Sequence, residues 1–442
     1  MITEQNCTML CDFYQLTMGN GYYNTRHADR IAYFDVFFRK VPDGGGYAIC
    51  AGLEQVINYI QGLHFTDDDI QYLRGKKIFS EGFLKYLRDF KFTGDIWAVP
   101  EGTPVFPSEP LLTVRAPAIQ AQLIETMLLL LINHQSLIAT KANRIVRAAQ
   151  GRAISEFGSR RAQGASGAVL GARAAYIGGC AGTACVIADE LYGVPATGTM
   201  AHSWVQMFDS ELEAFESYCR TYPDTSTLLV DTYNIEEAVK TAVEVAGPEL
   251  GGVRIDSGDL AAMAQRVRNQ LDALGATNTT ITVTNDLDEY ALAALQTAPV
   301  DSYGVGTMLV TGSGAPTCAM VYKLTEREGA DGTMVPVMKK SKDKATVPGR
   351  KLAFRSYEYA LAEAEHVISG SEEKLAGFTP EPTWKNLLVD FVDHGHIDAQ
   401  WQGHDAIMAA HDYHAKALSE LPITAQSLMK GEPVIPTETQ VL

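Results

Sequence analysis

The feature that most constrains the fold is a set of short apolar segments that recur from residue 153 onward at intervals of about thirty residues. Each segment ends in a polar or glycine cluster, and most are followed by a helical pattern, such as the one over 260–274. The expected strands are 153–157, 194–197, 227–230, 252–255, 280–283 and 302–305. Strands that alternate with helices at this spacing are typical of βα units. The sequence therefore predicts an α/β barrel over this part of the chain.

The segments on either side have a different rhythm. From residue 31 to about 117, short strands alternate with glycine- or proline-rich turns around one helix at 53–63, which indicates a small mixed sheet. Residues 118–149 have a helical period, broken near Asn133, and form a connector. Further strands are expected at 31–38, 95–99, 104–114 and 351–356. We predict three parts: 1–135, an α+β domain with its connector helix; 136–345, the α/β barrel; and 346–442, a C-terminal segment that returns to the first domain and adds helices.

Composition narrows the partners and the location. The formal net charge of -17 argues against binding to nucleic acid or to an acidic membrane, because their phosphates would be repelled. The longest apolar run, 123–132, is too short to span a bilayer, and the N-terminus lacks the pattern of a secretory signal. The 7 cysteines form no CxxC pair and have no histidine at zinc-ligand spacing. We therefore expect a cytoplasmic protein with reduced thiols and no metal-ligand set of its own.

One histidine stands at a position suited to chemistry. The stretch GTMAHS, residues 198–203, places His202 at a glycine-opened turn immediately before a helix expected over 203–220, with Ser203 as its N-cap. The positive end of that helix dipole favours the neutral imidazole and stabilises a bound anion. His202 is therefore a candidate acceptor of a phosphoryl group. The alternative is a buried histidine that hydrogen-bonds to a barrel strand.

Other polar residues follow the expected strands, where barrel loops carry the chemistry. They are Arg160, Arg161, Asp231, Arg254, Asp256, Asp259, Asn285, Asp286 and the GVGT stretch at 304–307. Arg254 and Asp256 are two residues apart on a strand, so both side chains point the same way, toward the barrel mouth or into a structural ion pair. The GVGT stretch is either a backbone phosphate cradle or an ordinary tight turn.

Taken together, the ordered motifs resemble those of the nicotinate phosphoribosyltransferase family. They are FGSRRAQG at 157–164, GTMAHS at 198–203, VDTYN at 230–234, GVRIDSGDL at 252–260, TNDLDE at 284–289, YGVGTMLVT at 303–311 and, near the N-terminus, LCDFYQLTM at 10–18. Two residues depart from the family pattern: Ser159 stands where leucine is usual, and Cys11 where threonine is usual. Both departures affect the expected base pocket more than the reaction class.

The resemblance implies an incomplete (β/α) barrel beside an open-faced α+β sandwich domain. It also implies that nicotinate and phosphoribosyl pyrophosphate become nicotinate mononucleotide and pyrophosphate, with ATP as co-substrate, Mg²⁺ as cofactor and His202 as the phosphorylated residue. Transfer at the anomeric carbon passes through an oxocarbenium-like state, so positioning and charge neutralisation dominate catalysis. The family further implies a homodimer with shared active sites, in which Tyr14 stacks on the pyridine ring in the partner's site.

Roles for the remaining site residues follow from the same resemblance. Arg254 is expected to contact the diphosphate or the phosphohistidine, and Asp256 the ribose hydroxyls or a metal-bound water. Arg160 offers a planar fork to the nicotinate carboxylate or a phosphate. The other expected substrate-binding residues are Phe157, Gly198, Ser203, Asp286, Gly304, Gly306 and Thr307, the last three around the 5'-phosphate. The basic loop Lys339–Lys344, together with Arg350, is either a mobile cover for ATP or pyrophosphate or a solvated turn.

Three other functions compete with this one. A nicotinamide phosphoribosyltransferase would not need Arg160 as a carboxylate partner, and a quinolinate enzyme, which uses no ATP, would leave His202 without a role. A sugar-phosphate lyase or isomerase on a barrel would use a similar glycine turn, but no lysine ends an expected barrel strand to form a Schiff base. A sensor that binds the nucleotide without catalysis is the last alternative.

Overall fold

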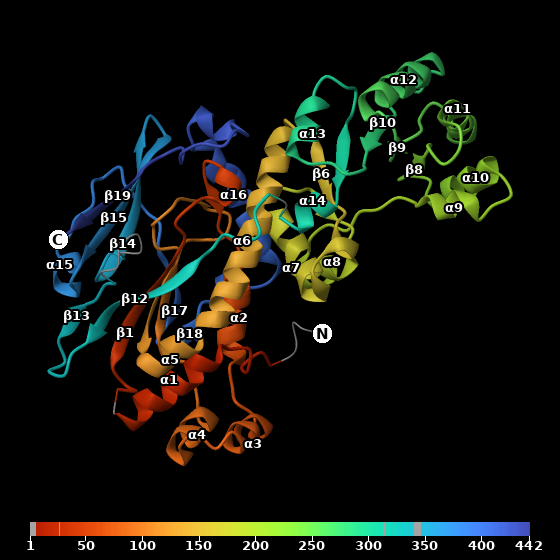
Figure 1. Ribbon diagram of the computed structural model, residues 1–442. Coiled ribbons are helices and arrows are strands. Elements are labelled where there is room, and N and C mark those ends of the chain that lie inside the picture. The colour runs from red at the N-terminus through yellow and green to blue at the C-terminus, as the bar shows by residue number, and fades with distance from the viewer. Residues whose placement is uncertain (1–5, 26, 313, 340–345) are drawn as a thin grey trace. The chain divides into compact units, whose positions relative to one another are not determined.

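The computed structural model describes residues 6–25, 27–312, 314–339 and 346–442. These residues form two compact units, one of Met1–Thr140 with Gly314–Leu442 and one of Lys141–Ser313, which we call the sandwich unit and the barrel unit (Figure 1). The barrel unit ends about thirty residues earlier than the expected boundary at 345, because the chain beyond it enters the sheet of the sandwich unit. Apart from Lys339, the basic loop 339–344 lies outside the described residues, so its role as a cover stays a prediction.

The barrel unit is built on a parallel sheet. Its described strands are β6 (Ala153–Glu156), β7 (Gly182–Thr183), β8 (Thr227–Leu229), β9 (Gly252–Ile255), β10 (Thr280–Val283) and β11 (Ser302–Val305). They lie in the order β7-β6-β11-β10-β9-β8, and every pairing is parallel. Among the described residues the edge strands β7 and β8 do not pair with each other, so the barrel is incomplete, as expected. The segment 194–197 contributes only a bridge between Thr183 and Ala196.

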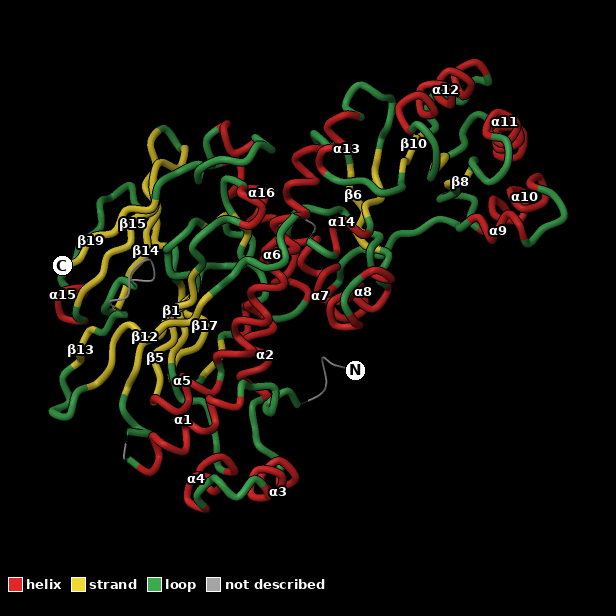
Figure 2. Tube along the Cα trace, viewed as in Figure 1, coloured by secondary structure: helices red, strands yellow, loops and turns green. Residues whose placement is uncertain are grey.

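Helices follow most of these strands (Figure 2). They are α7 (Gly164–Ile177), α8 (Val186–Tyr192), α9 (His202–Gln206), α10 (Glu211–Thr221), α11 (Ile235–Ala246), α12 (Leu260–Ala273), α13 (Glu289–Ala294) and α14 (Thr307–Val310). The helix expected over 203–220 is wrong as a single element, because the Ser210 side chain accepts a hydrogen bond from Glu213 N and starts the new helix α10. Ser203 is not an N-cap either, since α9 starts at His202 with Ala201 before it.

The sandwich unit contains an antiparallel sheet with the order β13-β12-β1-β5-β3-β17-β18. Its strands are β1 (Ile31–Phe37), β3 (Asp95–Ala98), β5 (Leu112–Pro117), β12 (Val321–Glu328), β13 (Met334–Pro336), β17 (Val389–Asp393) and β18 (His396–Ile397). Five consecutive residues of β1, Ala32–Val36, are buried, and the ring of Phe34 stacks on that of Tyr322 of β12 at 4.6 Å between centroids. Because of this long-range pairing, residues 321–328 belong to the sandwich unit and not to the barrel unit.

A second sheet of the sandwich unit has the order β16-β14-β15-β19, and β2 pairs with β4. These strands are β2 (Ala48–Ile49), β4 (Pro104–Val105), β14 (Arg350–Glu358), β15 (Leu361–Gly370), β16 (Lys385–Asn386) and β19 (Thr437–Val441). The strand expected over 104–114 is thus two strands, β4 and β5, separated by a turn in which Ser108 has φ 72°. The segment after residue 350 is richer in strands than expected.

The remaining helices are α1 (Phe13–Asn24), α2 (Leu53–Gly62), α3 (Asp67–Gly75), α4 (Glu81–Arg88), α5 (Ala118–Leu123), α6 (Glu125–Ala148), α15 (Glu372–Ala376) and α16 (His404–Ser419). The connector breaks at Ile124, between α5 and α6, and Asn133 lies inside α6, so the expected break near Asn133 is wrong. No helix in the described part of the chain combines the length and the hydropathy needed to cross a bilayer.

Candidate functional site

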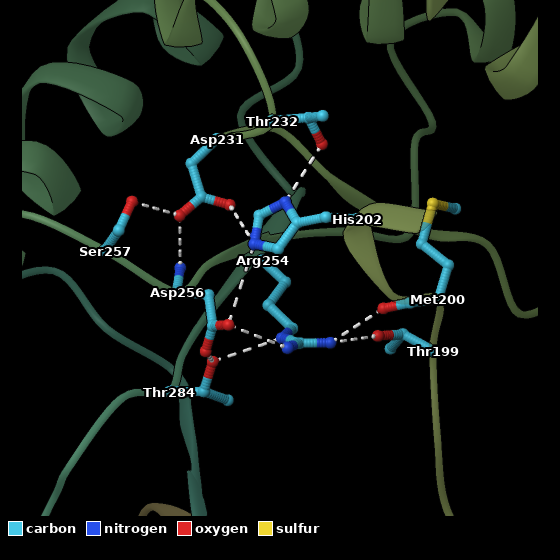
Figure 3. A network of polar contacts seen from close by, with 9 residues as sticks. All are labelled: Thr199, Met200, His202, Asp231, Thr232, Arg254, Asp256, Ser257 and Thr284. Atoms are coloured by element: carbon cyan, nitrogen blue, oxygen red, sulfur yellow. Dashed lines mark hydrogen bonds and ion pairs between the residues drawn. The ribbon is translucent and has the colours of Figure 1, made fainter. Parts of the chain in front are cut away.

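The His202 imidazole lies between a hydroxyl and two carboxylates (Figure 3). Its Nδ1 is 3.1 Å from Oγ1 of Thr232, in the loop after β8. Its Nε2 lies 3.9 Å from Oδ1 of Asp231 and 3.7 Å from Oδ2 of Asp256. The His202 side chain is 38% exposed, so it is not the buried histidine of the alternative interpretation. One side of the ring therefore faces negative charge and the other a neutral hydroxyl.

Asp231 joins the loops that follow β8 and β9. Its Oδ2 accepts hydrogen bonds from the backbone N of Asp256 at 2.8 Å and from Oγ of Ser257 at 2.6 Å. Its side chain is 1% exposed, and its Oδ1 is buried without a hydrogen-bond partner among the described residues. A buried carboxylate oxygen without a donor is costly, which marks this atom as a contact point for a proton or a cation.

Arg254 is held by every nitrogen of its guanidinium. Nη1 donates to Oγ1 of Thr199 at 3.1 Å and to the carbonyl of Met200 at 2.9 Å, in the segment that leads to His202. Nε donates to Oγ1 of Thr284 at 3.1 Å, and Nη2 lies 3.4 Å from Oδ2 of Asp256. The expectation that Arg254 and Asp256 point the same way is met, and the ion pair of the alternative interpretation is formed as well.

The glycines of the GVGT stretch are required by packing. A Cβ on Gly304 would lie 2.5 Å from Cδ2 of Phe157 and 2.7 Å from Cγ2 of Thr284, and a Cβ on Gly306 would lie 3.1 Å from the Phe157 carbonyl oxygen. Neither glycine has a positive φ. The stretch therefore lets the Phe157 ring lie against β11, and it continues into α14 at Thr307.

The loop after β6 is braced by a buried carboxyl. Glu156 accepts hydrogen bonds from Oγ1 of Thr183 at 2.6 Å and from the backbone N of Gly158. Burial raises the pKa of Glu156, while these two hydrogen bonds oppose the rise. Phe157 N in turn donates to the Val305 carbonyl at 2.8 Å, so the loop is tied to β7 and to β11.

Several expected site residues lie on the surface of the barrel unit. They are Arg160, Gly198, Ser203, Asp286 and Thr307, all of them exposed and in the barrel unit. Asp286 and its neighbour Asn285 have φ of 45° and 98°, a conformation that costs energy and that clusters at functional sites.

Tyr14 belongs to the sandwich unit, on α1, and is 45% exposed. Burial of its hydroxyl, followed by the charge and the hydrogen bond of Glu125, raises the pKa of Tyr14 to about 12. Its expected place in a partner's site stays a prediction.

Three threonines of the network carry no distinctive sequence signal: Thr199, Thr232 and Thr284. Each lies inside one of the motifs, but a threonine beside a strand is common in any fold. The sequence places Asp231 among the polar residues that follow the expected strands, but it indicates no role for this residue. Its contacts depend on the register of β8 against β9, which the sequence does not give.

Comparisons with known proteins agree with this architecture. The family profile of the nicotinate phosphoribosyltransferase (NAPRTase) N-terminal domain matches residues 9–133, and that of the quinolinate phosphoribosyl transferase C-terminal domain matches residues 138–313. Nicotinate phosphoribosyltransferase pncB1 of Mycobacterium tuberculosis is 41% identical over 439 residues, which cover 98% of this chain and 95% of that protein. The nicotinate phosphoribosyltransferase of Bacillus subtilis is 41% identical over 363 residues, which cover 80% and 74%.

Two solved structures resemble the fold. Human nicotinic acid phosphoribosyltransferase superposes with a TM-score of 0.80 at 27% identity and covers 97% of both chains. The nicotinate-nucleotide pyrophosphorylase of Pyrococcus furiosus superposes with a TM-score of 0.75 at 23% identity, covering 94% of this chain and 96% of that one, and supports the fold alone.

Proposed function

Since the chain belongs to the nicotinate phosphoribosyltransferase family and serves NAD salvage, we propose that ATP drives its reaction through a phosphate carried transiently on His202. The single observation that carries this proposal is the asymmetric surroundings of the imidazole, with two carboxylates beside Nε2 and one hydroxyl beside Nδ1. A transfer of phosphoribosyl alone would need no such histidine.

The surroundings of the ring favour Nδ1 as the phosphoryl acceptor. Carboxylates beside Nε2 favour the tautomer with its proton there, as a second partner commonly sets the tautomer of a functional histidine. A phosphoryl group on Nε2 would also be repelled by Asp231 and Asp256. In the proposed step the Nδ1 lone pair attacks the γ-phosphorus, the bond to the departing ADP oxygen breaks, and water later takes the phosphoryl group from the ring.

Mg²⁺ fits the oxygens of this site. Oδ1 of Asp231, which accepts no hydrogen bond among the described residues, and the Asp256 carboxylate, 29% exposed, are hard oxygen donors, and Mg²⁺ is commonly held by one or two carboxylates together with substrate phosphates. A different group, Asp95, Asp393 and His394, also has three ligand atoms close enough together to share an ion in the described part of the chain. It belongs to the sandwich unit, so it is not part of the site around His202 in the barrel unit. When bound, Mg²⁺ would neutralise charge on the pyrophosphate leaving group.

We assign the other substrate contacts as the family motifs suggest. Arg254 is proposed to meet the diphosphate and Asp256 the ribose hydroxyls, and Arg160 the nicotinate carboxylate. The Phe157 ring is proposed as one face of the base pocket and the 304–307 stretch as the 5'-phosphate contact, with Gly198, Ser203 and Asp286 around them. The 7 cysteines are all free thiols, which supports a cytoplasmic location for the enzyme.

The test of the phosphohistidine is His202→Ala. Without the imidazole, the ATP-stimulated part of nicotinate mononucleotide formation should vanish, while a slow ATP-independent transfer remains, because the anomeric chemistry does not pass through the ring. His404→Ala is the matched control, since His404 is also the first residue of a helix but lies in the sandwich unit. Retained ATP stimulation in the His202 variant would contradict the proposal, and nicotinamide and quinolinate, offered as acceptors beside nicotinate, test the competing substrates.

A homodimer with shared sites is proposed on the strength of α1. Leu10, Phe13, Tyr14 and Met18, in and just before this helix, are between 37% and 51% exposed, an apolar row of the kind that protein interfaces cover. A Tyr14→Ala chain mixed with a His202→Ala chain should regain activity, because one site of the mixed dimer would hold both native residues. If the subunits exchange and the mixture stays as inactive as the parents, Tyr14 does not act across subunits.

A further inference from the structure

We propose that Thr284 is a positioning residue that sets the relative geometry of Arg254 and Asp256 and so determines the affinity for phosphoribosyl pyrophosphate. Thr284 is buried at the end of β10 and is 4% exposed. The inference rests on the proposed function, in which Arg254 and Asp256 contact the diphosphate and the ribose of that substrate.

The Thr284 hydroxyl links the two charged side chains (Figure 3). It accepts a hydrogen bond from Nε of Arg254 at 3.1 Å and donates one to Oδ1 of Asp256. A threonine hydroxyl has one proton to donate, and its direction is fixed once that proton is committed. Because Nη2 of Arg254 lies 3.4 Å from the other oxygen of Asp256, the three side chains close a ring of contacts.

The backbone places this hydroxyl independently of the side chains that it orients. In the register of β10 against β9, Thr282 lies opposite Arg254, so Thr284 comes opposite Asp256 just beyond the strand ends. Thr284 N also donates to the Ile255 carbonyl at 3.0 Å. The position of the hydroxyl is therefore set by the sheet, and it can serve as a fixed reference for the charged ends of the Arg254 and Asp256 side chains.

The methyl group of Thr284 has a separate role. Cγ2 of Thr284 and the Phe157 ring occupy the space beside Gly304, since a Cβ there would lie within 2.7 Å of both. The methyl thus packs at the GVGT stretch, beside the ring that we assign to the base pocket. One side chain consequently supports the diphosphate side of the site through its oxygen and the base side through its carbon.

Thr284→Val and Thr284→Ser separate these two contributions. Valine keeps the branched shape but leaves Nε of Arg254 and Oδ1 of Asp256 without their partner, so kcat/KM for phosphoribosyl pyrophosphate should fall on the order of 100-fold, mainly through KM. The KM for nicotinate should change far less. Serine restores the hydroxyl, so the KM for phosphoribosyl pyrophosphate should return to within about fivefold of the wild-type value.

Thr282→Val is the matched control. It removes a hydroxyl from β10, two residues before Thr284. That hydroxyl contacts Oγ of Ser302 at 2.7 Å, and activity should stay within about twofold of the wild type. A general loss of packing would lower kcat, would affect the KM values of both substrates alike and would not be rescued by serine. If the valine variant does not fold, Thr284→Ala replaces it in the same comparison.

Arg254→Gln distinguishes the failure of this inference from the failure of its premise. If Arg254→Gln is inactive while Thr284→Val behaves like Thr282→Val, or if serine fails to rescue, the positioning role of Thr284 is wrong. If Arg254→Gln itself keeps normal affinity for phosphoribosyl pyrophosphate, the proposed role of Arg254 is wrong and the inference falls with it.

Discussion

Two arginine–carboxylate pairs in this protein have similar chemistry and opposite surroundings. Arg254 and Asp256 lie at the end of β9 in the barrel unit, with side chains 16% and 29% exposed. Arg355 and Glu365 lie opposite each other in β14 and β15 of the sandwich unit, and each side chain is 1% exposed. The first pair keeps one side open to solvent, whereas the second is enclosed by protein. The difference shows that position along the strand, more than residue type, decides whether such a pair is accessible.

A second buried carboxyl, that of Glu109, interacts electrostatically with the enclosed pair. Nε of Arg355 donates to Oε1 of Glu365 at 2.7 Å, and Nη2 donates to the Pro104 carbonyl at 2.6 Å. Glu109 lies nearby, fully buried, and accepts a hydrogen bond from Phe106 N at 2.8 Å. Burial, followed by the charge of Glu365, raises the pKa of Glu109 well above its ordinary value. Burial and the charge of Glu365 thus both favour the protonated form of the Glu109 carboxyl.

Breaking the enclosed pair should give the largest effect on stability. Arg355→Met leaves Glu365 buried without its cation, and removal of one partner from a buried pair costs about 3–5 kcal/mol of unfolding free energy. Urea unfolding at pH 7 measures this loss. Arg254→Gln is the matched comparison, with a small shift in the unfolding midpoint and a large loss of activity. If both variants lose stability equally and the folded fraction of each keeps full activity, the contrast between the pairs does not hold.

A smaller effect should appear as a pH dependence of stability in the same cluster. Because the folded-state pKa of Glu109 is raised, its contribution to stability is complete below the unfolded pKa of about 4.3 and is lost as the pH rises through the folded value. Glu109→Gln carries no such penalty, so its stability relative to wild type should increase by up to about 1.4 kcal/mol per pH unit within that window. Unfolding curves between pH 5 and pH 8 measure this. Parallel pH profiles for the two proteins would show that Glu109 is ionised in the folded protein.

The sequence predicts the barrel strands better than the site. Residues 252–255 and 280–283 are short apolar runs between polar clusters, and the structure has strands over both ranges. The helix over 203–220 fails because the apolar pattern of these residues continues across a break in the helix: Trp204 of α9 still packs on Tyr218 of α10, at 5.7 Å between ring centroids. Local periodicity reports which residues share a buried face but does not report that Ser210 starts a new helix.

The contacts within the site depend on which strands are neighbours, and periodicity does not contain that information. Arg254 and Asp256 are predictable because they lie on one strand. Thr284 is not, because its role arises from the pairing of β10 with β9, as the role of Asp231 arises from the pairing of β8 with β9. The sequence motifs locate the residues, and the sheet order decides which of them meet.

The central claim is that His202 carries phosphate during turnover, and its chemical identification is the most direct test. The enzyme is incubated with ATP, Mg²⁺, nicotinate and phosphoribosyl pyrophosphate, digested at alkaline pH to preserve acid-labile phosphate, and analysed by mass spectrometry and ³¹P NMR. We expect phosphate on the peptide that contains His202, attached at Nδ1. An unmodified His202 peptide during turnover, with full ATP dependence retained, would contradict it.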